Sequence, residues 1–391
     1  MMLETRSLDP ADISRSYDIR SRAFGALPES ARPGWESDAR AAVDARRVLG
    51  VYDGSLLVGR AMIWPFRQFW GGRDLAMAGI AGVVVAPEHR GRGVGTALMT
   101  GVIERGRELG FPPSVLYPAT VPVYRKRGWE IAGVQPRVTI QTRLLRELRG
   151  GDVTVREATP ADAEQMLGIM RGHYASGRAC GPRDYAVEEF AKELEDTSIF
   201  GYLAADGFVV YGWEGKGSHD VVVYQLVAAR PETARALWAI VGSSSSVAER
   251  VHAYLAPDDP IHQLLGECVR EESKQNRWML RLLDVASAMS GRGFTDGVDI
   301  DVPVVLEDDF VPANQVTGRL RVAKGTAELV EEKASETDAV RLSANGVACL
   351  YAGMPMGTLI TAGLASGGSE AHHSMLDAAF VGRPAYLLDY F

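Results

Sequence analysis

Residues 90–95, RGRGVG, combine two arginines and three glycines where backbone groups could hold a charged ligand. Glycine has no side chain, so its N–H can approach a ligand closely, and a helix beginning here would turn its positive dipole end toward that ligand. The preceding stretch, from Ala81 to Pro87, is rich in β-branched valine, as a buried strand is. Beyond the turn, four apolar residues recur at helical spacing until Gly110: Val94, Leu98, Val102 and Leu109. The sequence therefore predicts a strand, a turn that binds a pyrophosphate, and a helix.

The spacing of the arginines and glycines indicates which nucleotide the turn would hold. A P-loop requires Gly-Lys-Ser/Thr, which is missing, and a dinucleotide fingerprint counted from Gly91 would place Thr96 where glycine or alanine is needed. The pattern R-x-x-G-x-G, from Arg90 to Gly95, instead resembles the acetyl-CoA loop of the GNAT acyltransferase superfamily. A glycine-rich turn without a ligand is the alternative, and we predict such an ordinary turn for the second GRG, residues 291–293.

An internal similarity indicates that this kind of unit occurs twice. LETRSLDPADIS from Leu3 is similar to VTVREATPADAE from Val153, and both predict a short strand that leads into a helix opened by proline. Asp9 and Thr159 would cap these two helices. Two domains of one fold in tandem would explain the similarity, and chance is the alternative.

The remaining chain narrows the resemblance to one family. Gly150 and Gly151 mark a boundary, residues 278–290 (WMLRLLDVASAMS) have the apolar period of a helix, and the rest predicts an α+β module. Tandem GNAT-like units, this module, the stretch VPVYRKRGWE and a terminal aromatic residue together resemble the enhanced-intracellular-survival (Eis) family of N-acetyltransferases over nearly the whole chain.

The resemblance implies a mixed α/β (α+β) fold with three domains. A catalytic GNAT domain would occupy residues 1–148 and a degenerate GNAT-like domain residues 149–288. A sterol-carrier-protein-like α+β domain, residues 289–391, would supply the C-terminal carboxylate.

The resemblance also implies acetyl-CoA as co-substrate and no metal. Its pantetheine arm would lie along three consecutive valines, its pyrophosphate in the glycine turn, and the CoA arm against the segment before Tyr124. The residues implied for this site are Val83, Val84, Val85, Arg90, Gly91, Arg92, Gly93, Val94, Gly95, Thr96, Ala119 and Thr120.

Two residues carry the implied catalytic roles. Tyr124 takes the place of the family's general acid, since a tyrosine with a pKa of ~10 can donate to a departing thiolate with a pKa of ~8.5. The alternative is that Tyr124 only packs. The α-carboxylate of Phe391, buried and facing the amine, would serve as general base.

Aromatic residues would line the cleft for the amine substrate, with Phe24 and Trp35 at the positions implied, although isolated aromatic residues more often belong to a core. The sequence departs from relatives that acetylate aminoglycosides, which carry acidic residues where this chain has Ala26 and Tyr390. Asp389 is a candidate to compensate for one of these losses.

Other chemistry-bearing residues predict structure rather than a site. The second unit has no glycine cluster around Pro231, so it should be a scaffold. The three cysteines, Cys180, Cys268 and Cys349, lack metal or disulfide spacing and predict buried thiols. Adjacent helical residues point apart, so His372 and His373 should be solvated rather than metal ligands.

Composition limits the partners. The formal net charge of −8 and a pI of about 5.5 argue against a nucleic-acid surface and favour cationic small molecules weakly. No signal pattern and no apolar run of ~18 residues appear, which predicts a cytoplasmic protein without membrane contact.

These observations together predict an acetyl-CoA-dependent N-acetyltransferase that acts on a primary amine of an aminoglycoside, a polyamine-like molecule or a lysine. The resemblance implies a homo-oligomer, a hexamer. The alternative to an enzyme is a catalytically silent regulator that binds acetyl-CoA or, through the third domain, a lipid.

Overall fold

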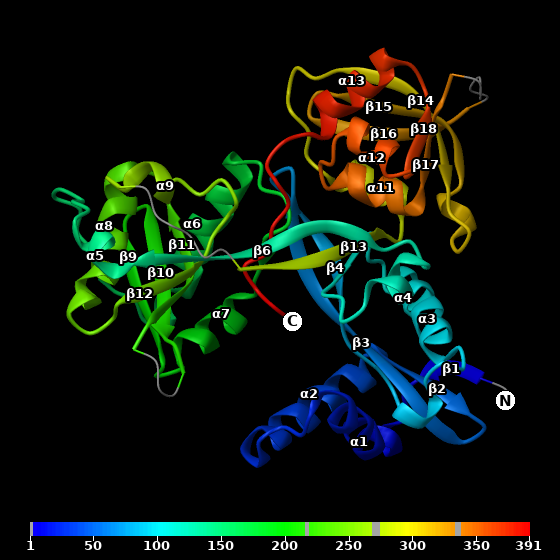
Figure 1. Cartoon of the computed structure of the whole chain (residues 1–391), viewed down its shortest axis with the longest axis horizontal. Helices are drawn as coiled ribbons and strands as arrows, with labels where there is room; N and C mark the ends of the chain where they lie inside the picture. Colours follow the sequence, from blue (N-terminus) through cyan, green and yellow to red (C-terminus); the bar gives the residue numbers. More distant parts are fainter. Residues whose placement is uncertain (1–2, 216–218, 268–273, 333–337) are drawn as a thin grey trace.

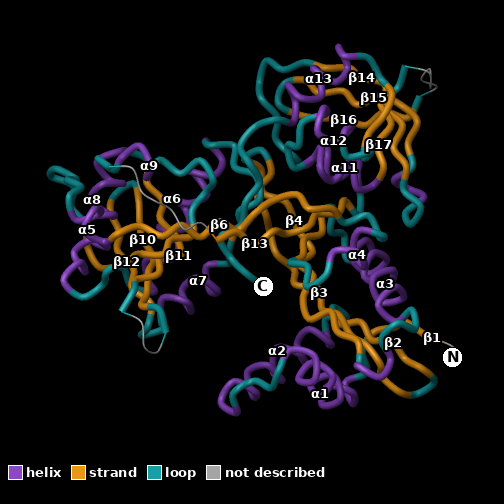
Figure 2. Tube along the Cα trace, in the orientation of Figure 1, coloured by secondary structure: helices purple, strands orange, loops and turns teal. Residues whose placement is uncertain are grey.

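The computed structural model describes residues 3–215, 219–267, 274–332 and 338–391 (Figure 1). Within these residues, strands form one long sheet of 13 strands and a second sheet of five strands. The long sheet runs through two GNAT-like units, and the five-stranded sheet belongs to a separate C-terminal domain (Figures 1 and 2). The predicted mixed α/β fold is confirmed.

The first unit is an antiparallel meander that ends in a parallel pair. Strands β1 (Leu3–Ser7), β2 (Val48–Asp53), β3 (Leu56–Trp70) and β4 (Arg73–Val85) pair antiparallel in sequence order, and β4 then pairs parallel with β5 (Pro113–Leu116). Helices α1 (Ile13–Phe24) and α2 (Arg32–Asp44) cover one face, and α3 (Val94–Glu108) covers the other. Gly110, at φ 77°, follows the end of α3 as predicted.

The two units exchange a strand. After α4 (Val121–Arg125) the chain enters β6 (Glu130–Gln141), which pairs with both β12 (Arg250–Tyr254) and β13 (Lys274–Leu282), and β13 inserts between β5 and β6. The prediction of one helix over residues 278–290 is therefore wrong in its first half. Residues 278–282 are all buried in β13, and a short apolar run does not distinguish a strand covered on both faces from a helix.

The second unit repeats the first. It contains α5 (Thr142–Arg146), β7 (Arg156–Glu157), α6 (Ala163–Ser176), β8 (Arg183–Asp184), α7 (Val187–Leu194), β9 (Ile199–Ala204), β10 (Gly207–Trp213), β11 (Val221–Ala228), α8 (Pro231–Gly242) and α9 (Ile261–Leu264). The predicted caps form at both repeats: Asp9 accepts from the N–H of Ala11, and Thr159 forms a capping box with Asp162. The tandem prediction is confirmed.

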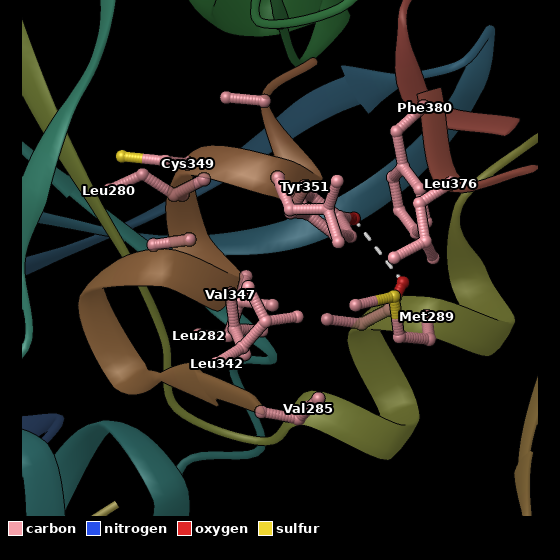
Figure 3. Close-up of a cluster of buried hydrophobic side chains, with 14 of the residues drawn as sticks. Leu280, Leu282, Val285, Met289, Leu342, Val347, Cys349, Tyr351, Leu376 and Phe380 are labelled. Carbon is pink, nitrogen blue, oxygen red and sulfur yellow. Dashed lines mark hydrogen bonds between the residues drawn. The ribbon is translucent and has the colours of Figure 1, made fainter. Parts of the chain in front are cut away.

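The C-terminal domain packs its helices on its own sheet and on β13. Its elements are α10 (Val285–Gly291), β14 (Ile300–Glu307), β15 (Val316–Ala323), β16 (Thr326–Glu331), β17 (Val340–Ser343), α11 (Ala344–Tyr351), α12 (Met356–Thr361), β18 (Ala365–Gly367) and α13 (Glu370–Phe380). Figure 3 shows the core that joins it to the long sheet, where Leu280 and Leu282 of β13 pack near Val347 and Tyr351 of α11. The C-terminal domain is thus held on the first unit.

The remaining sequence predictions concern thiols, histidines and membranes. Cys180 and Cys349 are buried and free, and Cys268 lies outside the described residues. His372 belongs to the capping box at the start of α13. A ring nitrogen of His373 lies 2.8 Å from the carbonyl oxygen of Gly367. No helix in the described ranges is both long and apolar enough to cross a membrane.

Candidate active site

The glycine turn has the geometry that a pyrophosphate site needs. Gly91 and Gly93 adopt φ values of 74° and 83°, in the left-handed region, and Gly93 is the residue that caps α3. A side chain at either position would meet no other atom within 4 Å, so this backbone is open to a ligand. Arg90, Arg92 and Thr96 are exposed around the turn. The free N–H groups at the start of α3 and the exposed arginines together suit an anion.

The strand before the turn leaves one backbone edge open. Pairing between β4 and β5 covers only Ala78 with Ser114 and Gly79 with Val115, so β4 continues through Val83, Val84 and Val85 beyond that ladder. A bulge at Gly82, where φ is 57°, shifts the register with β3. Ala119 and Thr120 are exposed in the loop between β5 and α4. This open edge leaves the backbone of Val83–Val85 accessible to an extended ligand chain.

Tyr124 lies in α4 and is 6% exposed. Its ring belongs to the cluster that also contains Val83 and Val85. Burial, with a smaller contribution from Tyr390, raises the pKa of Tyr124 to about 12. No described residue makes a hydrogen bond to its hydroxyl. The hydroxyl is therefore protonated and available to a ligand.

Phe391, at the end of the chain, lies between the two units (Figure 1). Its ring meets Phe66 of β3 edge-on at 5.0 Å and Tyr117, just after β5, at 5.6 Å. A Cβ on Gly79 would lie 3.0 Å from the Phe391 ring, so the glycine makes room for it. Tyr390 stacks on Tyr117 at 4.5 Å. The chain's last two residues therefore sit against β4 and β5.

The tail before Phe391 is fixed by hydrogen bonds from both units. Val134 of β6 exchanges backbone bonds with Ala385 and Leu387, and the N–H of Tyr386 donates to the carbonyl of Cys180. Side chains hold the next residues: Gln135 donates to the carbonyl of Leu388 at 2.9 Å, and the hydroxyl of Tyr117 donates to the carbonyl of Asp389 at 2.7 Å. None of these bonds uses Phe391.

The three predicted substrate residues lie in different surroundings. Phe24, at the end of α1, is 55% exposed, two residues after Arg22, which pairs with Glu88 beside the glycine turn at 2.9 Å. Trp35 of α2 meets Tyr17 edge-on at 5.1 Å and the Arg60 guanidinium at 5.6 Å. Trp35 therefore packs beside Arg60 of β3, whereas Phe24 is largely exposed at the end of α1.

Asp389 faces the second unit. One of its carboxylate oxygens accepts from the hydroxyl of Tyr185 at 2.5 Å, and the other lies 3.6 Å from the guanidinium of Arg183. It borders a cavity of about 700 Å³ that is also lined by Glu193 and Tyr224. Burial and the carboxylates of Asp389 and Glu189 raise the pKa of Glu193 to about 7. The charge of Asp389 is thus already paired.

Sequence reasoning missed several residues around the chain end. Tyr117, Trp64, Phe66 and Arg60 all lie beside the predicted site, and the last three alternate on one face of β3. The signal was present in RAMIWPF, residues 60–66, where an arginine stands on an otherwise apolar face. No sequence signal marks Tyr185 and Arg183, because only the tandem packing brings them to the tail.

The second unit lacks the ligand geometry at the equivalent turn. Its helix α8 begins after Arg230, and the carboxylate of Asp206 accepts from Arg230 at 2.7 Å and from the Thr233 hydroxyl at 2.7 Å. A carboxylate at this helix N-terminus takes the position where the first unit offers room for a phosphate. This geometry agrees with a scaffold.

One group of potential metal ligands lies away from the predicted site. Glu214, Asp220 and His252 bring their ligand atoms within 4.8 Å of one another. Arg137 pairs with Glu214 at 2.5 Å and Arg250 pairs with Asp220 at 3.1 Å. Because two guanidinium groups already neutralise the carboxylates, we interpret the group as an ion-pair network.

The comparisons with known proteins define the class. Residues 4–132 and 185–282 each match the family described as an acetyltransferase (GNAT) domain, and residues 285–388 match the sterol carrier protein domain. A GCN5-related N-acetyltransferase from Kribbella flavida is 45% identical, with a TM-score of 0.96 over 100% of this chain and 98% of that one. The chain is therefore an acyltransferase of the GNAT class.

Its relatives narrow the class to a family. An uncharacterized N-acetyltransferase of Streptomyces avermitilis is 30% identical over 347 residues, covering 82% of this chain and 83% of that protein. The N-acetyltransferase Eis of Mycobacterium tuberculosis is 27% identical over 266 residues, covering 64% of this chain and 66% of that protein. Eis1 of Mycobacterium abscessus shares the fold, with a TM-score of 0.77 at 23% identity over the full length of both chains. The chain belongs to the Eis family of GNAT N-acetyltransferases.

We expect Gly93→Val to weaken acetyl-CoA binding at least tenfold. Valine is strained at a φ of 83° and would put a side chain where the phosphates are predicted to approach. Calorimetric titration measures the effect, and the parent should bind one acetyl-CoA per chain. The matched control is Gly54→Val, a surface turn at φ 62° with equal strain and open space. Unchanged binding in Gly93→Val, or two equivalent sites in the parent, would contradict the assignment.

Proposed function

We propose that the chain transfers the acetyl group of acetyl-CoA directly to a primary amine in the first unit, with Tyr124 as general acid and the Phe391 carboxylate as general base. Acetyl-CoA supplies the activated acetyl group. In this proposal the turn at residues 90–96 holds its pyrophosphate, and Val83, Val84 and Val85 pair with its pantetheine arm. Ala119 and Thr120 flank that arm.

The Phe391 carboxylate has to bind and deprotonate the acceptor ammonium. An ordinary α-carboxylate has a pKa of ~3.5 and a lysine-like ammonium ~10.4, so direct transfer would be uphill by roughly 7 pKa units, or about 9 kcal/mol. Contact of the acceptor with the apolar rings of Phe66 and Tyr117 would desolvate both groups, which raises the carboxylate pKa and lowers that of the amine. The carboxylate therefore positions the ammonium first and receives its proton once the bound acceptor has displaced water from both groups.

Tyr124 has to stabilise the departing thiolate. With a pKa of about 12, its hydroxyl stays protonated, and complete transfer to a thiolate of pKa ~8.5 would be uphill by roughly 3 to 4 pKa units. A hydrogen bond from the hydroxyl stabilises the thiolate without that cost. The thiolate is then protonated at the expense of the second proton that the amine nitrogen loses when the amide forms, so Tyr124 ends protonated.

The observation that supports this proposal best is the position of the chain end. Phe391 packs on Gly79 and Tyr117, at the point where β4 and β5 separate, and Tyr390 influences the pKa of Tyr124. The chain end lies close enough to Tyr124 for Tyr390 to act on its pKa, which supports a joint role of Tyr124 and Phe391.

Thiol release from acetyl-CoA across a panel of amines tests the proposed function, with mass spectrometry of the acetylated product. The panel includes aminoglycosides, polyamines, lysine peptides and arylalkylamines. Release that depends on an amine and is lost in Gly93→Val supports the proposal. Acetyl-CoA binding without release for any amine would contradict it.

The pH dependence of kcat/KM should show no fall from ionisation of Tyr124 below about pH 11, and any fall at the pKa of the acceptor ammonium should remain in Tyr124→Phe. The tyrosine is neutral when protonated, and its pKa is raised from 10.0 to about 12, so the active protonated form persists two pH units longer than in solution. Steady-state rates between pH 6 and ~10.5 measure the profile. A descending limb centred near 10 that disappears in Tyr124→Phe would contradict the raised pKa.

A further inference from the structure

Arg60 is a buried cation whose charge the structure does not balance. It lies on β3, is 2% exposed, and its Nε is buried without a hydrogen-bond acceptor. Within the described ranges no carboxylate pairs with it. Burying an unpaired guanidinium costs several kcal/mol, so a group that compensates it when bound would gain much of that cost back.

The surroundings of Arg60 add positive charge rather than negative charge. Burial and the neighbouring charge of Arg20 lower the pKa of Arg60 to about 10, so it is still protonated at neutral pH. The guanidinium lies 5.6 Å from the centre of the Trp35 ring, which supplies a cation–π contact and no anion. An anion is therefore missing on this side of the site.

The position of Arg60 ties it to the reaction site. Its guanidinium nitrogen lies 3.3 Å from where a Cβ on Gly82 would be, directly against the bulge that precedes Val83. The ring of Phe391 likewise lies 3.0 Å from where a Cβ on Gly79 would be. Trp64, which pairs with Gly79, and Met62, which pairs with Ala81, lie on β3 between these two points.

On β4, Phe391, the residue that carries the proposed carboxylate, thus packs at Gly79, and the Arg60 guanidinium lies at Gly82. Gly79 and Gly82 are three residues apart, which corresponds to about 10 Å along a strand. This short spacing favours an acceptor whose two charged groups are only a few bonds apart.

We propose that the acceptor is an amine that carries a carboxylate a few bonds away, with its ammonium at the Phe391 carboxylate and its carboxylate at Arg60. This inference rests on the proposed function and names the substrate class of that site. Arg60 then determines specificity, because its planar guanidinium group can form two parallel hydrogen bonds to a carboxylate. The ligand carboxylate also supplies the negative counter-charge that Arg60 lacks in the fold. Acceptors with only cationic groups would add a positive charge beside Arg60 and Arg20.

The test compares acids with their own amides. Glycine, β-alanine and γ-aminobutyrate are each assayed against the corresponding primary amide, which keeps length and removes the charge. We expect the parent to favour the best acid over its amide about tenfold or more in kcat/KM, the effect of one charge-assisted hydrogen bond. Arg60→Met should reduce this preference to about one, and its melting temperature should be equal or higher because an unpaired buried charge is gone.

Arg47→Met provides the matched control. Arg47 is a partly buried arginine of the same unit whose pKa burial lowers, and it donates to the carbonyl of Ile63 at 3.3 Å. Its substitution should leave the preference for acids as in the parent. A parent that prefers the amides or putrescine would overturn the inference while leaving acetyl transfer in place. A lower melting temperature with equal losses for acids and amides in Arg60→Met would also overturn it. Absence of transfer to every amine would instead overturn the proposed function.

Discussion

Blocking the α-carboxylate of Phe391, by amidation or by a C-terminal extension, is expected to lower kcat by about a hundredfold or more and to leave acetyl-CoA affinity unchanged. The blocked residue keeps its ring against Phe66 and Tyr117, so packing is retained. The tail up to Asp389 is held by its own hydrogen bonds to β6, Cys180 and Tyr117. Only the negative charge that binds the acceptor ammonium is removed.

Semisynthetic amidation with thiol-release kinetics measures this effect, and an N-terminal extension is the control that should be harmless. Deleting Phe391 should give a similar loss of turnover, because it moves the carboxylate back by one residue, ~3.3 Å. If the last residue only anchors the C-terminal domain, deletion lowers the melting temperature and amidation has no effect. Full activity in an extended protein, verified by mass spectrometry, would remove the carboxylate from the mechanism.

Replacing Tyr124 with phenylalanine should lower kcat by about 10² to 10⁴, the usual effect of a general acid, with acetyl-CoA affinity retained. The ring stays in its cluster with Val83 and Val85, so only the hydroxyl is lost. Because no described residue bonds to that hydroxyl, its loss leaves no partner unsatisfied in the free protein. Titration and steady-state rates together separate binding from turnover.

Tyr52→Phe is the matched control for this substitution. Tyr52 is fully buried in the same unit, burial raises its pKa to about 12, and its hydroxyl donates to Asp12 at 2.9 Å. Its substitution should reduce stability slightly and leave turnover as in the parent. Equal losses in binding and turnover in Tyr124→Phe would indicate a packing role for Tyr124.

The features that local sequence determines could be predicted. The turn at residues 90–95 lies between a valine strand and α3 because glycine positions, helix spacing and the stop at Gly110 act over neighbouring residues. The repeated helix starts at Asp9 and Thr159 are equally local.

Features that depend on distant contacts could not be predicted. Residues 278–282 form β13 because β5 and β6 bury them on both sides, and the period of a short apolar run carries no sign of those neighbours. The assignment of Phe391 came from family resemblance, since spacing along the chain says nothing of its packing on Gly79. Arg60 stood out only as an arginine among apolar residues, and its missing counter-charge became visible in the fold.

The most direct test of the account is the structure of the Tyr124→Phe variant with acetyl-CoA, determined by diffraction. We predict the pyrophosphate on the N–H groups of residues 91–95, the pantetheine arm paired with Val83–Val85, and the thioester between residue 124 and the Phe391 carboxylate. Acetyl-CoA bound in the second unit, or a thioester remote from Phe391, would contradict the assignment of the first unit as the acetyl-transfer site.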